Sequence, residues 1–184
     1  MRTPRRFEQL ALPHMAAAFS LAYWLMRDRA DAEDVVQDAY VRAVRGFDGF
    51  RGDDIRPWLL AIVRNVAWRA LSVRRRANNV IPIETGFAAG DDGDMALAAA
   101  DPSAETLMIE AGDRALLTRA LTALTPLFRE ALVLREMQEM SYTDIAIVLG
   151  VPKGTVMSRL SRARAELRSR FKELEGETDK HAVR

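Results

Sequence analysis

Basic and hydroxyl side chains crowd the segment 153–168, which follows a short break at residues 150–152. Guanidinium and ammonium groups bind phosphate oxygens, and arginine, serine and threonine also hydrogen-bond the edges of bases. Apolar residues recur in this segment at steps of four, three and four, which places them on one face of a helix: Val156, Leu160, Ala163 and Leu167. The segment therefore predicts a helix with one buried face and one face suited to nucleic acid.

The predicted nucleic-acid face combines small or hydroxyl-bearing residues with cations at its margins. A helix in the major groove needs such side chains, because small residues allow close approach to base edges and cations meet phosphates. At about 100° per residue, this face holds Gly154 and the candidate duplex contacts Thr155, Ser158, Ser161 and Arg162, with Arg159 at its edge and Lys153 at the helix start. The alternative is a solvated charged face without a partner.

The residues before this helix have the spacing of a helix-turn-helix. Ser141, with Asp144 three residues later, is close to a capping box and predicts a helix start. Ala146 is small where two helices would touch, Gly150 can take a positive φ in the turn, and Val156 would fill the gap between the helices. Because this spacing is independent of the charges, it favours the DNA-binding interpretation over the solvated face.

A second candidate site is the acidic segment 29–44. Helical periodicity leaves it an outward surface of Glu33, Asp34, Gln37, Asp38 and Val41. An enzyme interpretation would use Asp34 and Asp38 as metal ligands. The chain has only two histidines, His14 and His181, and offers no second ligand cluster. We therefore expect no metal and no cofactor. A face that docks on a protein partner is favoured over the alternative, a solvated acidic face.

Aromatic and basic side chains lie together in residues 47–77. A charged, glycine-containing loop over 50–56 leads into a helical pattern with two tryptophans and a basic end. Aromatic and basic residues side by side can stack on separated bases and hold their backbone. Trp58, Leu59 and Ile62 are more typical of a core, so the loop is the better candidate for direct contact.

The secondary-structure elements that position these side chains belong to a chain of 184 residues, a length that suits one ordinary domain or two small ones. Hydrophobic residues make up 49% of the chain, which is enough for a packed core. The sequence has no cysteine, which excludes disulfides, thiolate metal sites and cysteine nucleophiles. Its longest apolar stretches, such as 14–26, are too short to cross a bilayer, and residues 1–10 lack the apolar block of a signal peptide. We expect a cytoplasmic protein without direct membrane insertion.

Charge is divided unevenly along the chain. The formal net charge is +1, but residues 1–78 carry +5, residues 79–106 carry −6 and residues 107–184 carry +2. The middle segment also mixes Gly, Pro, Ser and Asp without a sustained period. This organisation predicts two modules that tolerate nucleic acid, joined by a flexible acidic linker.

Both flanks of the linker have helical periodicity, and no alternating run is long enough to indicate a sheet. The sequence therefore predicts an all-α fold of two small helical domains. We expect helices in the two segments of the helix-turn-helix and over 7–25, from a cap at Asp31 through Val44, from Pro57 to Arg75, over 104–124 and over 126–139.

The order of three motifs resembles the sigma-70 family of bacterial RNA polymerase sigma factors, in its small extracytoplasmic-function (ECF) group. The motifs are "DAEDVVQDAYVRA", then "RPWLLAIVRN" with a basic tail, and, after the linker, "LTPLFREALVLREMQEMSYTDIAIVLGVPKGTVMSRLSRARAEL". The resemblance covers nearly the whole chain, apart from the first few residues and the tail after Lys172. It implies an alternative sigma factor, which directs transcription initiation.

The resemblance also implies a division into sigma domain 2 over 1–78, the acidic linker over 79–106, sigma domain 4 over 107–172 and a tail over 173–184, which we expect to be frayed. In domain 4, the helix-turn-helix would read the minus-thirty-five promoter element as duplex. In domain 2, the loop and helix would open and read the minus-ten element through Arg51, Arg56, Arg64, Asn65, Arg69, Arg74 and Arg75.

The partners that the resemblance implies are core RNA polymerase, promoter DNA in duplex and melted form, and an anti-sigma factor. Asp34, Gln37 and Asp38 match the surface that docks on the clamp coiled coil of the largest polymerase subunit. The first helices of domain 4 would grip the flap of the second-largest subunit. Catalysis of RNA synthesis would belong to the polymerase, so we expect no active site in this chain.

A stand-alone helix-turn-helix transcriptional regulator is the main alternative. Such a protein would bind DNA without polymerase, usually as a dimer on paired half-sites. Its N-terminal module should resemble a receiver or a ligand pocket, and residues 1–78 do not. The enzyme interpretation lacks ligands beyond Asp34 and Asp38 and a concave site.

Overall fold

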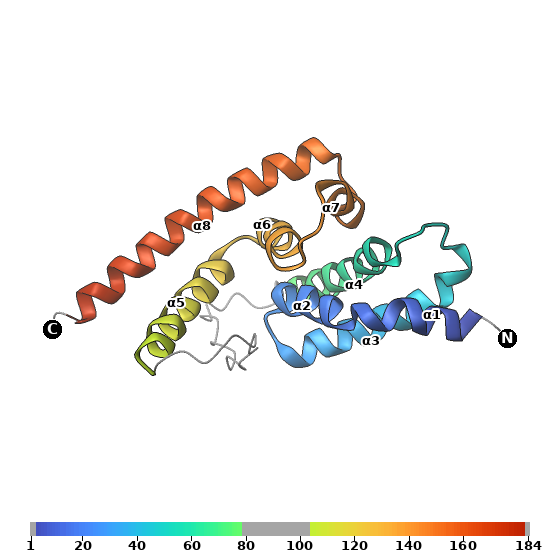
Figure 1. The fold of residues 1–184 in the computed structure, drawn as a ribbon, viewed down its shortest axis with the longest axis horizontal. Coiled ribbons are helices and arrows are strands. Elements are labelled where there is room, and N and C mark those ends of the chain that lie inside the picture. The colour runs from blue at the N-terminus through green and yellow to red at the C-terminus, as the bar shows by residue number, and fades with distance from the viewer. Residues whose placement is uncertain (1–2, 79–103, 183–184) are drawn as a thin grey trace.

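The computed structural model describes residues 3–78 and 104–182, and helices account for all the regular structure in those two ranges (Figure 1). The prediction of an all-α fold is confirmed. Most of the predicted acidic linker, residues 79–103, lies outside the described residues, and its expected last residues, 104–106, already belong to a helix.

Four α-helices and two 3-10 turns make up the first module within residues 3–78. The helical pattern predicted over 7–25 is divided at Pro13, because proline has no N–H to continue the helical hydrogen bonds. The elements are α1 (Thr3–Ala11), a 3-10 turn (Leu12–His14), α2 (Met15–Met26), α3 (Arg29–Gly46), a second 3-10 turn (Phe47–Gly49) and α4 (Ile55–Asn78).

Asp28, rather than Asp31, caps α3. Asp28 has an extended backbone, and its carboxylate accepts a hydrogen bond of 2.9 Å from the backbone N–H of Asp31. The prediction of a cap at Asp31 is therefore wrong by three residues. Both positions carry an aspartate, the kind of side chain that caps helices. Arg27, with φ at 59°, turns the chain sharply just before the cap and so selects Asp28.

The second module contains α5 to α8 within residues 104–182. Its elements are α5 (Ala104–Ala123), α6 (Pro126–Leu132), a π-helical turn (Val133–Met137), α7 (Tyr142–Leu149) and α8 (Lys153–Ala182). Glu139, where a helix was predicted to end, has φ at 51° and lies beyond the π-helical turn. Helix α8 continues as far as Ala182 and so includes most of the segment 173–184 that the sequence assigns to the tail.

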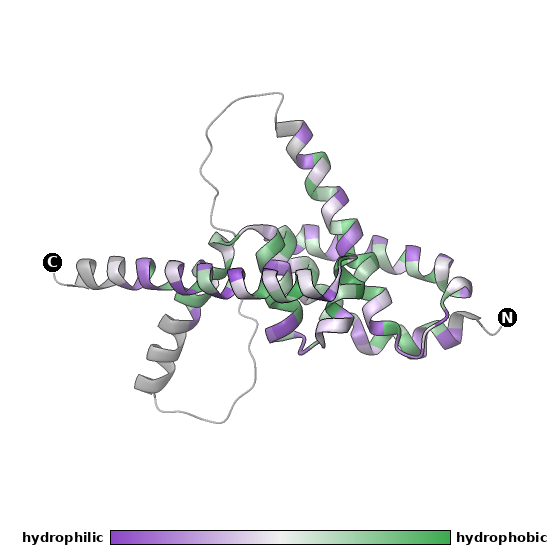
Figure 2. Ribbon diagram, turned by 90° about the horizontal axis from the view of Figure 1, so that it is seen from above, coloured by the Kyte–Doolittle hydropathy of each residue, from purple (hydrophilic) through white to green (hydrophobic). Residues whose placement is uncertain are grey.

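The two modules share one hydrophobic core instead of standing apart on a tether. Helix α4 packs against α7, and α2 packs against α6. Leu21, Leu60 and Val63 of the first module belong to the same buried cluster as Leu134 and Ile145 of the second. Figure 2 shows the hydrophobic residues concentrated in the centre of the molecule, where the helices cross. The sequence predicted two domains but did not reveal this joint core.

A smaller aromatic cluster fixes the end of the first module that carries the loop 50–54. Phe7 and Phe47 meet edge to face with ring centroids 5.4 Å apart, and Phe50 lies 5.3 Å from Trp58. Leu59 is completely buried in this cluster, which confirms that this part of α4 belongs to a core. The cluster anchors both ends of the loop, so its charged residues are held at a defined place on the surface.

Candidate nucleic-acid interface

The helix-turn-helix formed by α7 and α8 has the geometry that its spacing predicts. Ser141 caps α7: its hydroxyl oxygen accepts from the Asp144 N–H at 3.1 Å and donates to the Asp144 carboxylate at 2.6 Å. Gly150 ends α7 with φ at 63°, a left-handed conformation that glycine adopts without steric cost. Val156, from the start of α8, is completely buried. The turn therefore presents α8 at a fixed angle to α7.

Helix α8 has the two faces that its periodicity predicts. Val156, Leu160 and Ala163 are buried, and Leu167 is half-buried against the same core. On the outer side Thr155 is half-buried, and four of the six candidate duplex contacts are exposed: Lys153, Ser158, Ser161 and Arg162. Because the exposed residues lie along the first three turns of one helix, they can enter a groove together.

Arg159 is the exception among the candidate duplex contacts. Only 21% of its side chain is exposed, and its Nη1 atom lies 3.7 Å from a carboxylate oxygen of Glu130 in α6. This side chain points toward the junction of the two modules rather than outward with Arg162. Its assignment to DNA stays a prediction.

Glu130 also holds the centre of α4. The Nε and Nη2 atoms of Arg64 donate to its two carboxylate oxygens at 2.8 and 2.9 Å, and the indole N–H of Trp68 donates at 2.7 Å. Glu130 is completely buried, and Arg64 keeps 16% of its side chain exposed. Paired fork-like hydrogen bonds between guanidinium and carboxylate are among the strongest that side chains form. Arg64, a candidate minus-ten contact in the first module, is thus bound by Glu130 of the second module.

Arg56, at the start of α4, is engaged in the same way. Its Nη2 atom donates to the backbone carbonyl of Gln138 at 2.7 Å and to the Gln138 side-chain oxygen at 3.1 Å. The Arg56 Nε atom is buried without a hydrogen-bond partner. Two of the arginines predicted to meet the minus-ten element therefore face the second module.

Four further candidate residues of the first module are exposed: Arg51, Asn65, Arg69 and Arg74. Asn65 and Arg69, one helical turn apart, are both exposed on α4. Arg51 is exposed and donates to the backbone carbonyls of Asp48 and Phe50 at 2.6 and 3.0 Å, which holds the loop in shape. Arg74 pairs with Asp31, and the side chain of Arg75 lies outside the described part of α4.

The acidic face of α3 borders an apolar groove. Asp34, Gln37 and Asp38 are exposed, as predicted. Arg42 donates two hydrogen bonds to Asp38 at 3.0 and 2.8 Å, and this pairing holds the pKa of the Asp38 carboxyl below its usual value. The adjacent groove has a volume of about 890 Å³, and Glu33 and Gln37 are among the residues that line it. Its other lining residues are mainly apolar and include Leu12, Met15, Phe19, Tyr40 and Val41.

Arg129 and Glu130 are functional candidates that the sequence interpretation missed. Both are buried in α6, where the neighbouring residues over 126–134 are mainly apolar on all sides. The guanidinium of Arg129 donates to four backbone carbonyls, those of Leu121, Thr122, Leu124 and Trp24. Burial and the nearby Arg27 lower the pKa of Arg129 to about 10, so it remains charged at neutral pH. The signal in the sequence was the presence of two consecutive charged residues in an otherwise apolar helix. Such a helix is usually buried, so charged residues in it need partners inside the protein.

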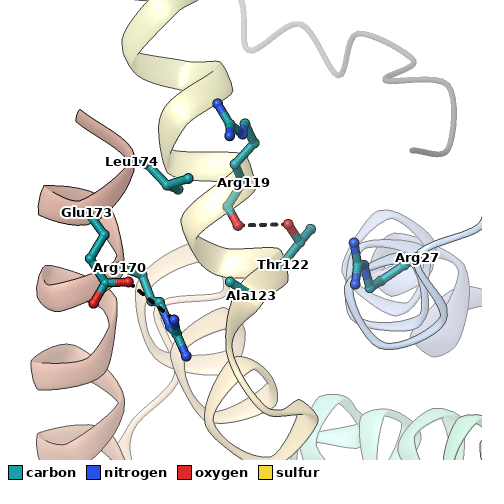
Figure 3. Close-up of a pocket in the computed structure, with 7 residues that line it drawn as sticks. All are labelled: Arg27, Arg119, Thr122, Ala123, Arg170, Glu173 and Leu174. Atoms are coloured by element: carbon teal, nitrogen blue, oxygen red, sulfur yellow. Dashed lines mark hydrogen bonds and ion pairs between the residues drawn. The ribbon is translucent and has the colours of Figure 1, made fainter. Parts of the chain in front are cut away.

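A basic hollow of about 380 Å³ lies where the end of α2 meets α5 and α8 (Figure 3). Arg27, Arg119 and Arg170 line it from these three elements, and Glu173 forms an ion pair with Arg170 at 3.2 Å. The hollow gathers basic side chains from both modules, because Arg27 belongs to the first module and Arg119 and Arg170 belong to the second.

The described residues bring together no group of three or more His, Asp or Glu side chains able to hold a metal ion. Asp34 and Asp38 therefore gain no further acidic or histidine ligand within 3–78 and 104–182. In the same described part of the chain, no helix has the length and apolar character needed to cross a membrane.

Comparison with known proteins agrees with the two-module division. The family model for sigma-70 region 2 matches residues 10–77, and that for sigma-70 region 4 matches residues 114–167. The chain is 35% identical to the RNA polymerase sigma-H factor of Pseudomonas aeruginosa, over 87% of this chain and 83% of that protein. It is 33% identical to the ECF RNA polymerase sigma-E factor of Escherichia coli K12, over 78% and 75% of the two chains.

The fold is similar to that of a solved sigma factor. The crystal structure of the sigma factor RpoE in complex with the anti-sigma factor NepR, from Bartonella quintana, matches with a TM-score of 0.68 and 29% identity. The match covers 91% of this chain and 98% of that one. The similarity therefore includes both modules.

Proposed function

The chain belongs to the sigma-70 family, in its extracytoplasmic-function group, and from this premise we propose that it binds core RNA polymerase and directs it to specific promoters. The observation that carries the proposal is the exposed polar and basic row on α8, mounted on a helix-turn-helix of fixed geometry. RNA synthesis itself is catalysed by the polymerase, and the chain acts in the cytoplasm, where polymerase and chromosome meet.

The second module reads the minus-thirty-five element as duplex DNA. Ser161 and Arg162 lie on the outer face of α8 and contact base edges, together with Thr155 and Ser158. Lys153, at the exposed start of the helix, meets a phosphate, where the N-terminal end of a helix also favours negative charge. Arg159 joins this row once it is released from Glu130.

The first module opens and reads the minus-ten element. Asn65 and Arg69 form an exposed pair on α4, and the loop 50–54 is fixed beside an aromatic cluster. Separated bases need a surface that offers both hydrogen bonds and positive charge, and these side chains supply both. Arg51, Arg56, Arg64, Arg74 and Arg75 add cations along the path of the melted strand.

The groove beside α3 docks on the clamp coiled coil of the polymerase. Its apolar floor fits the apolar stripe of a helix. The carboxylate of Glu33, which lines the groove, and those of Asp34 and Asp38, exposed on the same helix, complement basic residues on such a partner. The first helices of the second module, α5 and α6, grip the flap. Because one relative in the comparison was solved with an anti-sigma factor, we extend regulation by such a partner to this chain.

Substitutions on α3 test the docking groove with a matched control. Val41 is 43% exposed and lines the groove, whereas Val44 is 47% exposed on the same helix and does not line it. Val41→Asp should weaken binding to core polymerase at least about tenfold, because it places a charge in an apolar contact. Val44→Asp should bind within about twofold of the unchanged chain. Equal losses for both variants, measured by fluorescence anisotropy, would contradict the docking assignment.

Transcription in vitro tests the function as a whole. Purified core polymerase, the chain and a library of promoter fragments should give transcripts that start at defined sites and share two upstream elements. The free chain should bind the same fragments far more weakly than its complex with polymerase, because each module alone makes few contacts. Specific duplex binding by the chain alone, without initiation, would favour a stand-alone regulator.

A further inference from the structure

The carboxylate of Glu130 joins three cationic or polar side chains that come from two different modules. It is completely buried, it accepts from Arg64 and Trp68 of α4, and it lies 3.7 Å from Arg159 of α8. We infer that Glu130 is an intramolecular latch that keeps the free chain closed and withholds Arg64 and Arg159 from DNA. The part of this inference that concerns DNA rests on the proposed function of the two arginines. The part that concerns closure rests only on the contacts of Glu130.

The latch sits at the middle of a continuous junction. On one side, Arg56 binds the backbone and side chain of Gln138, and on the other, Arg129 donates to the Trp24 carbonyl at 3.1 Å. Apolar packing of α4 on α7 and of α2 on α6 fills the space between these contacts. Glu130 is distinguished from the rest because it is the buried anion to which both arginines are attracted, and one of them lies on each DNA-binding helix.

Closure and DNA binding compete for the same atoms. Arg64 directs its Nε and Nη2 atoms at a buried carboxylate and keeps only 16% of its side chain exposed, so this edge of the guanidinium is not available to a phosphate or a guanine. Arg159 is held in the junction rather than beside Arg162 on the outer face of α8. A promoter complex that uses these arginines therefore requires the modules to separate, at least locally.

Two unsatisfied polar atoms at the junction lower the stability of the closed state. The Nη1 atom of Arg159 and the Nε atom of Arg56 are buried without a hydrogen-bond partner. A buried polar atom that lost water and gained no partner raises the free energy of the closed state. A surface that binds the separated modules, such as polymerase, can then offset the loss of the Glu130 contacts and pull the chain open.

The absence of cysteine in the sequence makes a direct test of opening possible. Gln9 in α1 and Thr143 in α7 are exposed, so both can be changed to cysteine and spin-labelled in the otherwise unchanged chain. Double electron–electron resonance then measures the distance between the modules without polymerase or DNA. We expect a single narrow distance distribution for the labelled chain, because one closed arrangement dominates.

Glu130→Gln keeps the size of the side chain and removes its charge, which leaves Arg64 and Arg159 facing each other across the junction. We expect it to raise the ratio of open to closed molecules on the order of tenfold or more, seen as a broader distribution at longer distances. The matched control is Glu136→Gln, which removes an exposed carboxylate that pairs with Arg164 inside the second module at 2.7 Å. A broad distribution in the unchanged chain, or equal distributions for the two variants, would overturn the latch.

A second variant keeps the test decisive if Glu130→Gln loses helical content in circular dichroism. Trp68→Phe keeps an aromatic ring and removes only the indole N–H that donates to Glu130. It should also shift molecules to the open state, by a smaller factor of about three to ten, and no shift in this folded variant would overturn the inference. Transcription with core polymerase distinguishes a failure of the latch inference from a failure of the proposed function. If the chain supports initiation but the variants do not open, only the latch is contradicted. If the variants open but the chain supports no initiation, only the proposed function is contradicted.

Discussion

The two helices that we propose to bind DNA, α4 and α8, differ in how many of their candidate contacts are exposed to solvent. On α8 the polar row is exposed, and only Arg159 turns toward the other module. On α4 two predicted contacts, Arg56 and Arg64, are drawn into the junction, while Asn65 and Arg69 face solvent. In the free chain, arginines of α4 thus hold the two modules together, whereas Arg162 on α8 is exposed to solvent.

The difference follows from what each helix packs against. Helix α8 buries one narrow apolar stripe within its own module, so the opposite face is left to solvent. Helix α4 is covered on more than one side, by α2 and α3 and also by α7. Arginines on the covered sides of α4 need partners inside the protein, and Gln138 and Glu130 provide them for Arg56 and Arg64.

The largest expected effect concerns the buried side of α8. Leu160 is 1% exposed, and Leu160→Ala should lower the free energy of unfolding by about 3 kcal/mol, because it leaves a cavity in a close-packed core. Met157, on the same helix, is 53% exposed, and Met157→Ala should change stability by less than about 0.5 kcal/mol. Urea unfolding followed by circular dichroism makes the comparison, and similar losses for both variants would contradict the assigned sides of α8.

A second comparison divides the arginines of α4. Arg64→Ala should lower the free energy of unfolding of the free chain by about 2 kcal/mol, because a buried carboxylate loses two charge-assisted hydrogen bonds. Arg69→Ala, at an exposed position, should leave it within about 0.5 kcal/mol.

In promoter opening by the complete polymerase, both arginine variants should be impaired, because we propose that both side chains contact DNA once the modules separate. Permanganate reactivity of unpaired thymines measures this opening. If Arg64→Ala impaired promoter opening and Arg69→Ala did not, Arg69 would not be a contact to the minus-ten element.

The exposed face of α8 should show its effect in base preference. Arg162→Ala should cost about 1 to 3 kcal/mol on the preferred minus-thirty-five sequence and should relax the preference for particular bases. Arg168→Ala is the control, because this exposed arginine lies about two turns further along α8 and outside the predicted row. Selection of promoter variants with the complete polymerase measures both, and an unchanged preference after Arg162→Ala would remove that residue from the contact set.

The smallest expected effect is that of Lys153, which should act through a phosphate. Lys153→Ala should reduce affinity similarly for all sequences and lower the slope of log affinity against log salt by about one. Lys172, exposed nearer the other end of α8, provides the control, and Lys172→Ala should leave the slope unchanged. A change of base preference on Lys153→Ala would show that this residue does more than meet a phosphate.

Local patterns in the sequence accounted for most of the fold and for the exposed polar face of α8, one of the two faces that we propose to bind DNA. The steps of Val156, Leu160 and Ala163 identified the buried side of α8, and Gly150 identified the turn before it. These predictions succeeded because side-chain direction along a helix is set by backbone geometry over a few residues. The choice between Asp28 and Asp31 as a cap failed, since it depended on the turn at Arg27.

By itself the sequence determined the helices, the helix-turn-helix and the family. Only the tertiary structure decided that the two modules share a core and that Arg64 spends its hydrogen bonds on Glu130, 66 residues further along the chain. The physical reason is that periodicity reports which side of a helix is apolar, whereas the partner of a buried charge is chosen by packing between distant segments. Without that packing, Arg64 and Arg69 look alike.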